Sequence, residues 1–248
     1  MYFWQVILLE MKRIFLYSMS ILLFAFGCGC GNDDNAKAPF EGRLLKRMTI
    51  EANYPENNQT ADFTYDSKHR IATITLVGEI DDFFTYAYNN RNQVTSISKA
   101  NGEDFAFEYD NEGRLSGYTE GNVDHAVVYN SGNQTYTING SAFVLKENGD
   151  ILTENGMTYN YSSVGSATLK GPLRDVVGSS YQLTTYLAQY DAIVYMVKDS
   201  FTGRSGNPDA LFNFTLTNGY DYQDYTMQTN YGSFGLTFHC TFEYFQNE

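Results

Sequence analysis

One seven-residue phrase returns four times in this chain of 248 residues, at intervals of 23, 21 and 20. Each copy consists of an aromatic residue, Asp or Asn, three turn-forming residues, Arg or Gln, and an aliphatic or β-branched residue. The copies are Tyr65–Ile71, Tyr88–Val94, Tyr109–Leu115 and Tyr129–Thr135. A period near twenty that holds two short strands and one turn predicts an all-β fold, an antiparallel array of β-hairpins arranged as an extended twisted sheet or as an open two-layer structure. Degraded copies follow at Leu145–Ile151 and Tyr161–Ala167.

The residue types within one copy indicate how its turn closes. The side chains of Asp66, Asn89, Asp110 and Asn130 can fold back onto the backbone of their own turns. Gly113 or Asn92 can then adopt the positive φ that a tight hairpin requires. The apolar pairs Ile71/Ile74, Val94/Ile97 and Leu115/Tyr118 are each three residues apart. Strict alternation would put the two members of a pair on opposite faces, so we expect a bulge after each turn.

A long side chain recurs at one position of every copy, as Arg70, Gln93, Arg114 and Gln134. We expect each of them to lie along the neighbouring tyrosine, with its head group on turn carbonyls or on an acid. The alternative is a row of guanidinium groups that faces a ligand. Two of the four copies lack the charge, which favours the structural interpretation.

The phrase Tyr-Asp-x-x-Gly-Arg-Leu, intact at 109–115 and looser at 65–71, resembles the YD repeat of the RHS and teneurin families. The resemblance covers about residues 60–165 and implies a hairpin meander without catalytic residues of its own. In those families long arrays spiral into a shell, and we expect four to six copies to be too few to close one around cargo. The whole chain is also similar to short YD-type lipoproteins of Bacteroidetes.

The N-terminal region has the layout of an export signal. A positive start at Met11-Lys12-Arg13 precedes an apolar run over 14–26, which predicts a signal peptide over residues 1–27 with Met11 as the true start. Ala25-Phe26-Gly27-Cys28 resembles a bacterial lipobox, with Cys30 as the alternative lipid site. The acidic run over 31–35 resembles the signal that sends Bacteroidetes lipoproteins to the outer face of the outer membrane. Residues 28–42 are then a lipid-anchored, flexible spacer.

Composition limits the classes of partner that the chain is expected to bind. The chain contains 21 Tyr and 18 Phe, side chains that suit strands, and its net charge of −13 leaves no basic patch for nucleic acid. Beyond Cys28 and Cys30 the only cysteine is Cys240, expected as an inert buried thiol on the apolar face of a strand that ends the chain. His69, His125 and His239 are far apart, so no metal site or cofactor is expected.

The C-terminal region, 171–248, is predicted to continue the sheet of the repeat region, 43–170. Short helical turns are expected near 172–190 and strands at 192–198 and 236–244. A turn-rich loop is expected at 199–209, and a hairpin across Asn218-Gly219. Asn-Gly pairs at 101–102, 139–140, 148–149 and 155–156 predict further turns. A first hairpin is expected from 44–52 and 59–65.

The sequence predicts no catalytic residue. The acidic pairs Asp81-Asp82, Glu103-Asp104 and Asp221/Asp224 could supply the two carboxylates of a glycan-active hydrolase, but in so acidic a chain such pairs arise by chance. We therefore expect a non-catalytic surface binding or adhesion module of the outer membrane, exposed at the cell surface. It would contact glycan or protein through a sheet face or the 199–209 loop. The alternatives are the hydrolase and a purely structural envelope protein.

Overall fold

The computed structural model of the chain describes residues 40–164, 167–188, 195–206, 214–233 and 236–245. Contacts separate residues 1–40 from residues 41–248, and only the second unit is described below. Seventeen of its strands form one sheet. They are β1 (Leu45–Ala52), β2 (Gln59–Tyr65), β3 (Ile71–Gly78), β4 (Asp82–Tyr88), β5 (Val94–Lys99), β6 (Phe105–Tyr109), β7 (Leu115–Glu120), β8 (Val123–Asn130), β9 (Thr135–Ile138), β10 (Ser141–Leu145), β11 (Ile151–Glu154), β12 (Met157–Tyr161), β15 (Phe201–Ser205), β16 (Phe214–Thr215), β17 (Thr217–Tyr220), β18 (Thr226–Ser233) and β19 (Leu236–Tyr244). The remaining elements are η1 (Pro55–Asn57), the two-stranded pair β13 (Ser163–Val164) and β14 (Ala167–Thr168), and the helix α2 (Tyr181–Leu187).

The sheet is an antiparallel meander that almost closes on itself. Each strand from β1 to β12 pairs with the next, and β12 then pairs with β15 and β15 with β16. From the other side, β1 pairs with the last strand, β19, which pairs with β18 and that with β17. A short seam remains between β16 and β17, bridged by the amide of Asn218, which donates to the carbonyl of Phe201 at 2.8 Å. The predicted antiparallel hairpin array is confirmed.

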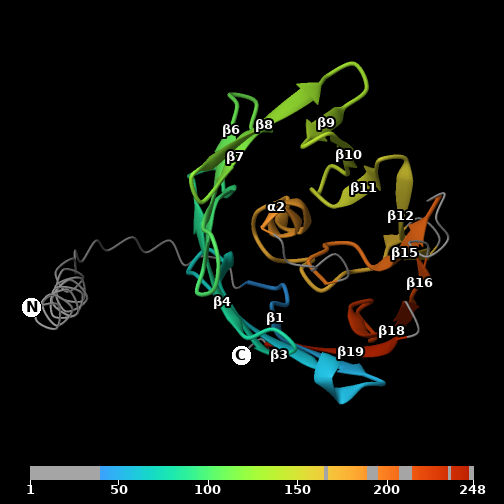
Figure 1. Cartoon of the computed structure of the whole chain (residues 1–248). Coiled ribbons are helices and arrows are strands. Elements are labelled where there is room, and N and C mark those ends of the chain that lie inside the picture. Colours follow the sequence, from blue (N-terminus) through green and yellow to red (C-terminus); the bar gives the residue numbers. More distant parts are fainter. Residues whose placement is uncertain (1–39, 165–166, 189–194, 207–213, 234–235, 246–248) are drawn as a thin grey trace, which may run out of the picture. The chain divides into compact units, whose positions relative to one another are not determined.

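The inside of this shell is filled by the chain itself. Figure 1 shows α2 at the centre of the curved sheet. Six of the seven helix residues are buried, including Gln182, Thr184 and Thr185. Buried residues on either side of the helix, Leu173 and Val176 before it and Tyr195 to Val197 after it, extend the same core. The repeat copies do not close a shell by themselves, as expected: the C-terminal strands complete the curve, and the enclosed segment belongs to the protein.

The bulges expected after the turns are present. Tyr65 pairs with Ile71 while Thr64 pairs with Thr73, so one residue of β3 is left over, and the same shift recurs in the second and third copies. Both members of each apolar pair thereby turn inward. Their exposed fractions are at most 6%, for Ile71, Ile74, Val94, Ile97, Leu115 and Tyr118. The extra residue is what lets two side chains three apart share one face.

The first hairpin, the Asn-Gly turns and the last strand agree with the prediction. β1 and β2 form the first hairpin. The pairs at 139–140 and 155–156 have positive φ at both positions, as a type I′ turn requires. In β19 the Cys240 side chain is fully buried, and burial raises the pKa of its thiol to about 12.

Three C-terminal predictions are wrong. Residues 195–198 form turns and bends where a strand was expected, and 192–194 lie outside the described residues. The loop predicted at 199–209 contains strand β15, and residues 207–209 lie outside the described residues. Asn218-Gly219 lies within β17, and the turn of that hairpin comes at 221–225.

Close contacts explain why these turn-forming residues stand in strands. Gly203 has φ of +134°, and a Cβ there would lie 2.1 Å from the carbonyl oxygen of Phe214, so the glycine allows β15 and β16 to approach closely where they pair. Ser200 before it is buried and bonds the hydroxyl of Tyr220 at 2.9 Å. Small and polar residues at 199–203 thus serve a tightly packed interior, and the exposed residues begin at Ser205.

Candidate binding site at the turn edge

The turns of the repeat copies lie along one edge of the sheet, called here the turn edge. Around it, one contact recurs: a tyrosine hydroxyl donates to the backbone carbonyl of a residue that begins a neighbouring strand. The bonds are Tyr65 to Leu45 at 2.7 Å, Tyr88 to Ile71 at 2.6 Å, Tyr109 to Val94 at 2.8 Å, Tyr161 to Ile151 at 2.6 Å and Tyr244 to Thr226 at 2.7 Å. Burial is the main reason why the pKa values of Tyr65, Tyr88 and Tyr109 are raised.

In the first three copies the Asp or Asn organises the turn. Asp66 accepts the backbone N–H groups of Lys68 and Arg70, and Asn89 accepts the equivalent pair from Arg91 and Gln93. In the third copy Asp110 accepts from the backbone N–H of Arg114 at 2.8 Å. The residue two places before the end of each copy takes positive φ, and it is His69, Asn92 and Gly113 in turn.

The long side chains of these copies join one turn to the next. The guanidinium carbon of Arg70 lies 4.4 Å from the ring centre of Tyr88, and that of Arg114 lies 4.8 Å from Tyr129. Gln93 donates to the carbonyl of Gly113 at 2.6 Å. Arg70 and Arg114 also pair with the aspartate of their own copy. These groups are engaged within the protein, which disfavours a ligand-facing row.

The degraded copies differ from each other. In the fifth copy, 145–151, the turn is kept, because Lys146 N–H donates to Asp150 at 2.7 Å and Gly149 N–H to Lys146 at 2.9 Å. At 161–167 Tyr161 keeps its hydroxyl bond, but the backbone after it forms the separate pair β13–β14. The prediction of a sixth copy there is therefore wrong beyond the tyrosine, and residues 165–166 lie outside the described residues.

One further copy was missed in the sequence. At Tyr220–Thr226 the N–H of Asp221 donates to Tyr225, and Asp221 accepts the N–H groups of Gln223 and Tyr225. The cation comes from the other end of the chain, since Arg43 pairs with Asp221 and lies 5.2 Å from the ring of Tyr225. The dipeptide Tyr220-Asp221 could have indicated this copy in the sequence. The neighbouring pair Asn218-Gly219 led to the turn being expected there instead.

The fourth copy, Tyr129–Thr135, closes differently. Its register pairs Tyr129 with Tyr136 and Asn130 with Thr135, without the bulge of the first three copies. Gln134 has φ of +56° and an exposed side chain, and among the described residues its amide bonds neither a turn carbonyl nor an acid. In the next copy Leu145 stands in the position of the aromatic ring.

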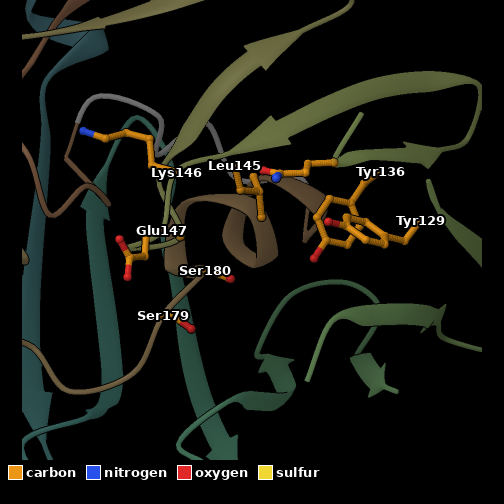
Figure 2. Close-up of a pocket in the computed structure, with 9 residues that line it drawn as sticks. Tyr129, Tyr136, Leu145, Lys146, Glu147, Ser179 and Ser180 are labelled. Atoms are coloured by element: carbon orange, nitrogen blue, oxygen red, sulfur yellow. The ribbon is translucent and has the colours of Figure 1, made fainter. Parts of the chain in front are cut away.

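A pocket opens beside this fourth turn. Its volume is about 190 Å³, and it is lined by Tyr129, Gln134, Tyr136, Leu145, Lys146, Glu147, Gly149, Ser179 and Ser180. Figure 2 shows the two tyrosine rings on one side and Glu147, Ser179 and Ser180 on the other. The tyrosine ring centres are 4.7 Å apart with the planes at 52°. The two serines come from the segment that leads into α2.

Several acidic side chains that were considered for hydrolysis accept hydrogen bonds from backbone N–H groups in turns. Asp81 accepts the N–H of Gly78, Asp82 those of Phe83 and Asn101, and Asp104 that of Lys99. Burial acts to raise the pKa of Asp221, but the bonds from Gln223 and Tyr225 and the charge of Arg43 hold it below the ordinary value. A general acid for glycoside cleavage needs the opposite shift.

Asp150 is the one carboxyl group whose pKa rises markedly among the described residues. Burial raises it to about 6, against the opposing effect of the N–H groups of Lys198 and Asp199. Its exposed fraction is 2%, and Asp199 beside it pairs with Lys146 and Arg174. Asp150 is thus enclosed by backbone and is not part of an accessible acid–base pair.

Two other kinds of site were sought within the described part of the chain. It contains no group of three His, Cys, Asp or Glu side chains placed to hold a metal ion. None of its helices combines the length and the apolar character needed to span a membrane. Cys28 and Cys30 lie outside the described residues.

Comparison with known proteins gave one family and similar solved structures. The teneurin YD-shell family matches residues 43–171. A porin-like protein from Bacteroides uniformis ATCC 8492 is 14% identical with a TM-score of 0.42, covering 81% of this chain and 98% of its own. A porin-like protein from Bacteroides vulgatus ATCC 8482 is 13% identical with a TM-score of 0.44, covering 82% and 99% respectively. No curated protein matches the chain.

Proposed function

Because the chain belongs to the teneurin YD-shell family, we propose that it is a non-catalytic binding module, held by lipid in the outer membrane and exposed at the cell surface. The observation that carries this proposal is how the polar side chains of the turn edge are used. Asp66, Asp110 and Asp221 cap their own turns, and the long cations lie on rings. These contacts support a structural use of the repeat side chains over a catalytic one.

The anchor is supported by the sequence. The positive start, the apolar run and Gly27-Cys28 have the order of a lipoprotein signal. Several acyl chains on one cysteine would hold a protein far more firmly than a single chain, which gives only marginal membrane binding. The acidic residues that follow, Asp33 and Asp34, favour export to the outer face.

Labelling with palmitate tests the anchor. Label should disappear in a Cys28→Ser variant and persist in Cys30→Ser. The reverse result moves the lipid to Cys30, and label in neither the wild type nor either variant refutes the anchor. Protease added to intact cells should remove the wild-type protein, whereas a protein facing inward would survive until the outer membrane is opened.

Binding and catalysis are tested with the purified full chain in detergent. It should retain glycans on an array or capture a surface protein without cleaving any of them. Cleavage that Asp221→Asn abolishes would favour the hydrolase, although that variant also loses turn contacts, so its melting temperature must be measured alongside. Absence of all binding would leave the purely structural role.

A further inference from the structure

The fourth copy differs from the others in what its tyrosine hydroxyl does. Five tyrosines of the turn edge donate to a backbone carbonyl, as described above. Within the described residues, Tyr129 makes no such bond, and neither does its ring neighbour Tyr136. Both rings are half-buried, and their hydroxyl groups line the pocket. Two hydroxyl groups are thus left available at a place where the rest of the array uses them for cohesion.

The other polar groups of the pocket are also available. The side chains of Gln134, Glu147, Ser179 and Ser180 line it and have no hydrogen-bond partner among the described residues. Ser180 precedes α2 with φ of +63° and does not cap the helix with its hydroxyl. Six polar side chains from four segments therefore converge on one pocket, where a bound ligand could use their donors and acceptors.

Charge restricts the ligand. Lys146 reaches the pocket wall, but its ammonium group pairs with the buried Asp199 and lies 4.0 Å from the ring centre of Tyr161. The one remaining formal charge in the wall is the carboxylate of Glu147, on a protein of net charge −13. An anionic ligand would be repelled, and the wall is too polar to favour an apolar one.

Size restricts it further. At about 190 Å³ the pocket is smaller than the roughly 300–1,000 Å³ of sites that enclose drug-sized ligands, so it suits one small ring with its hydroxyl groups. Hydroxyl groups of such a ring can both donate to Glu147 and Gln134 and accept from the tyrosines and serines.

We propose that the pocket at the fourth turn binds one neutral sugar unit, at the end or in a side branch of a glycan. The proposal rests on the proposed binding role and names its ligand class and its residues. Tyr129 and Tyr136 hold the sugar from one side, and Ser179, Ser180 and Glu147 hold it from the other. A single subsite of this size gives weak binding, so several copies of the protein on one surface would act together on a polymer.

The test uses the full chain in detergent and methyl glycosides of glucose, galactose, mannose and N-acetylglucosamine, followed by saturation-transfer NMR. At least one glycoside should bind, with a dissociation constant on the order of a millimolar. Tyr129→Phe and Tyr136→Phe keep the rings and remove the hydroxyl groups. Each should weaken binding about fivefold, the effect of losing one hydrogen bond of about 1 kcal/mol.

The matched control is Tyr222→Phe, which removes the hydroxyl of a tyrosine that is 87% exposed and outside the pocket. It should bind like the wild type, and all variants should share one melting temperature. Methyl glucuronide should bind more weakly than methyl glucoside, and Glu147→Gln should reduce that difference.

Three results would overturn the inference in different ways. Equal affinity in the wild type and in a variant carrying both Tyr129→Phe and Tyr136→Phe would place sugar binding elsewhere and leave the binding role intact. Failure of the wild type to bind any glycoside would rule out a sugar as the ligand of the pocket. The proposed binding role would then depend on whether the same preparation captures a surface protein. Glucuronide binding as tight as glucoside binding would refute the neutral ligand class.

Discussion

The first three copies and the fourth have similar sequences and opposite uses. In the first three, the tyrosine hydroxyl, the Asp or Asn side chain and the Arg or Gln head group all bond to the protein, either in their own turn or in a neighbouring copy. In the fourth, Asn130 accepts from Gly132 alone among the described residues, Gln134 is exposed, and Tyr129 lines a pocket. Regular copies build the edge, and the irregular copy leaves polar groups available to a ligand.

The difference originates in a neighbour. The long side chain of a copy is held by the aromatic ring of the next, as Arg70 is by Tyr88. After the fourth copy that ring is absent, because Leu145 stands there. Without a ring to lie on, Gln134 gains nothing from the regular position, and the turn closes in another register. One substitution in a repeat thus changes the copy before it.

The largest difference in stability between the first and the fourth copy is expected at the residue that ends each copy. Ile71 is fully buried, whereas Thr135 at the equivalent position is half-buried. Ile71→Ala should reduce the free energy of unfolding by about 2–5 kcal/mol, the usual cost of a core cavity. Thr135→Ala should cost less than about 1 kcal/mol. Urea unfolding of the two variants measures both, and equal losses would show that the fourth copy is as tightly packed as the first.

The pH dependence of stability should separate the acid of the first copy from that of the fifth. The pKa of Asp66 is lowered, although burial acts to raise it, by the bonds and charge of Arg70 and by Lys68 N–H. Its stabilising effect is present above its unfolded value and is lost as the pH falls through the lowered one. The pKa of Asp150 is raised by burial to about 6, so ionising it opposes folding.

For Asp150 the pH dependence of the free energy of unfolding has the opposite sign. Between pH 4 and 6 the folded state binds more protons than the unfolded state, so stability falls as the pH rises through that window. A shift from 3.8 to about 6 corresponds to roughly 3 kcal/mol at 1.36 kcal/mol per pKa unit. The difference in unfolding free energy between Asp150→Asn and the wild type should therefore change by that order between pH 4 and 7. A constant difference would mean that Asp150 titrates normally.

The tyrosine hydroxyls provide a more direct test of the comparison. Tyr88→Phe leaves the carbonyl of Ile71 without its partner in a half-buried setting and should cost about 1–3 kcal/mol. Tyr129→Phe breaks no bond within the described structure and should change stability by less than about 0.5 kcal/mol. Thermal unfolding of both variants in the same buffer measures the two losses of stability. A loss in Tyr129→Phe as large as in Tyr88→Phe would contradict the account of the pocket.

Much of the repeat region could be predicted because local chemistry decides it. The Asp/Asn turn, the positive φ at Asn92 and Gly113 and the bulge before Ile74 depend on residues within one hairpin. The C-terminal region could not, because its turn-forming residues respond to distant partners. Gly203 is a strand residue only because Phe214 passes within contact distance, and Asp221 finds its cation in Arg43. The pocket could not be predicted from the sequence either, since Ser179 and Tyr129 come to line one pocket only when the sheet curves around the segment that leads into α2.

The smallest expected effect comes from making the fourth copy regular. Asn133→Gly with Gln134→Arg supplies the residues of the third copy at those two positions. Alone, the pair should change stability by less than about 0.5 kcal/mol, because Leu145 offers the new guanidinium no ring. With Leu145→Tyr added, the arginine gains an aromatic face, and a double-mutant cycle should reveal a coupling of about 0.5–1 kcal/mol. The same triple variant should lose glycoside binding, since Leu145 lines the pocket and the larger ring would occupy it. A coupling near zero would mean that the register of the fourth turn is set by its own residues, and not by the ring missing from the fifth.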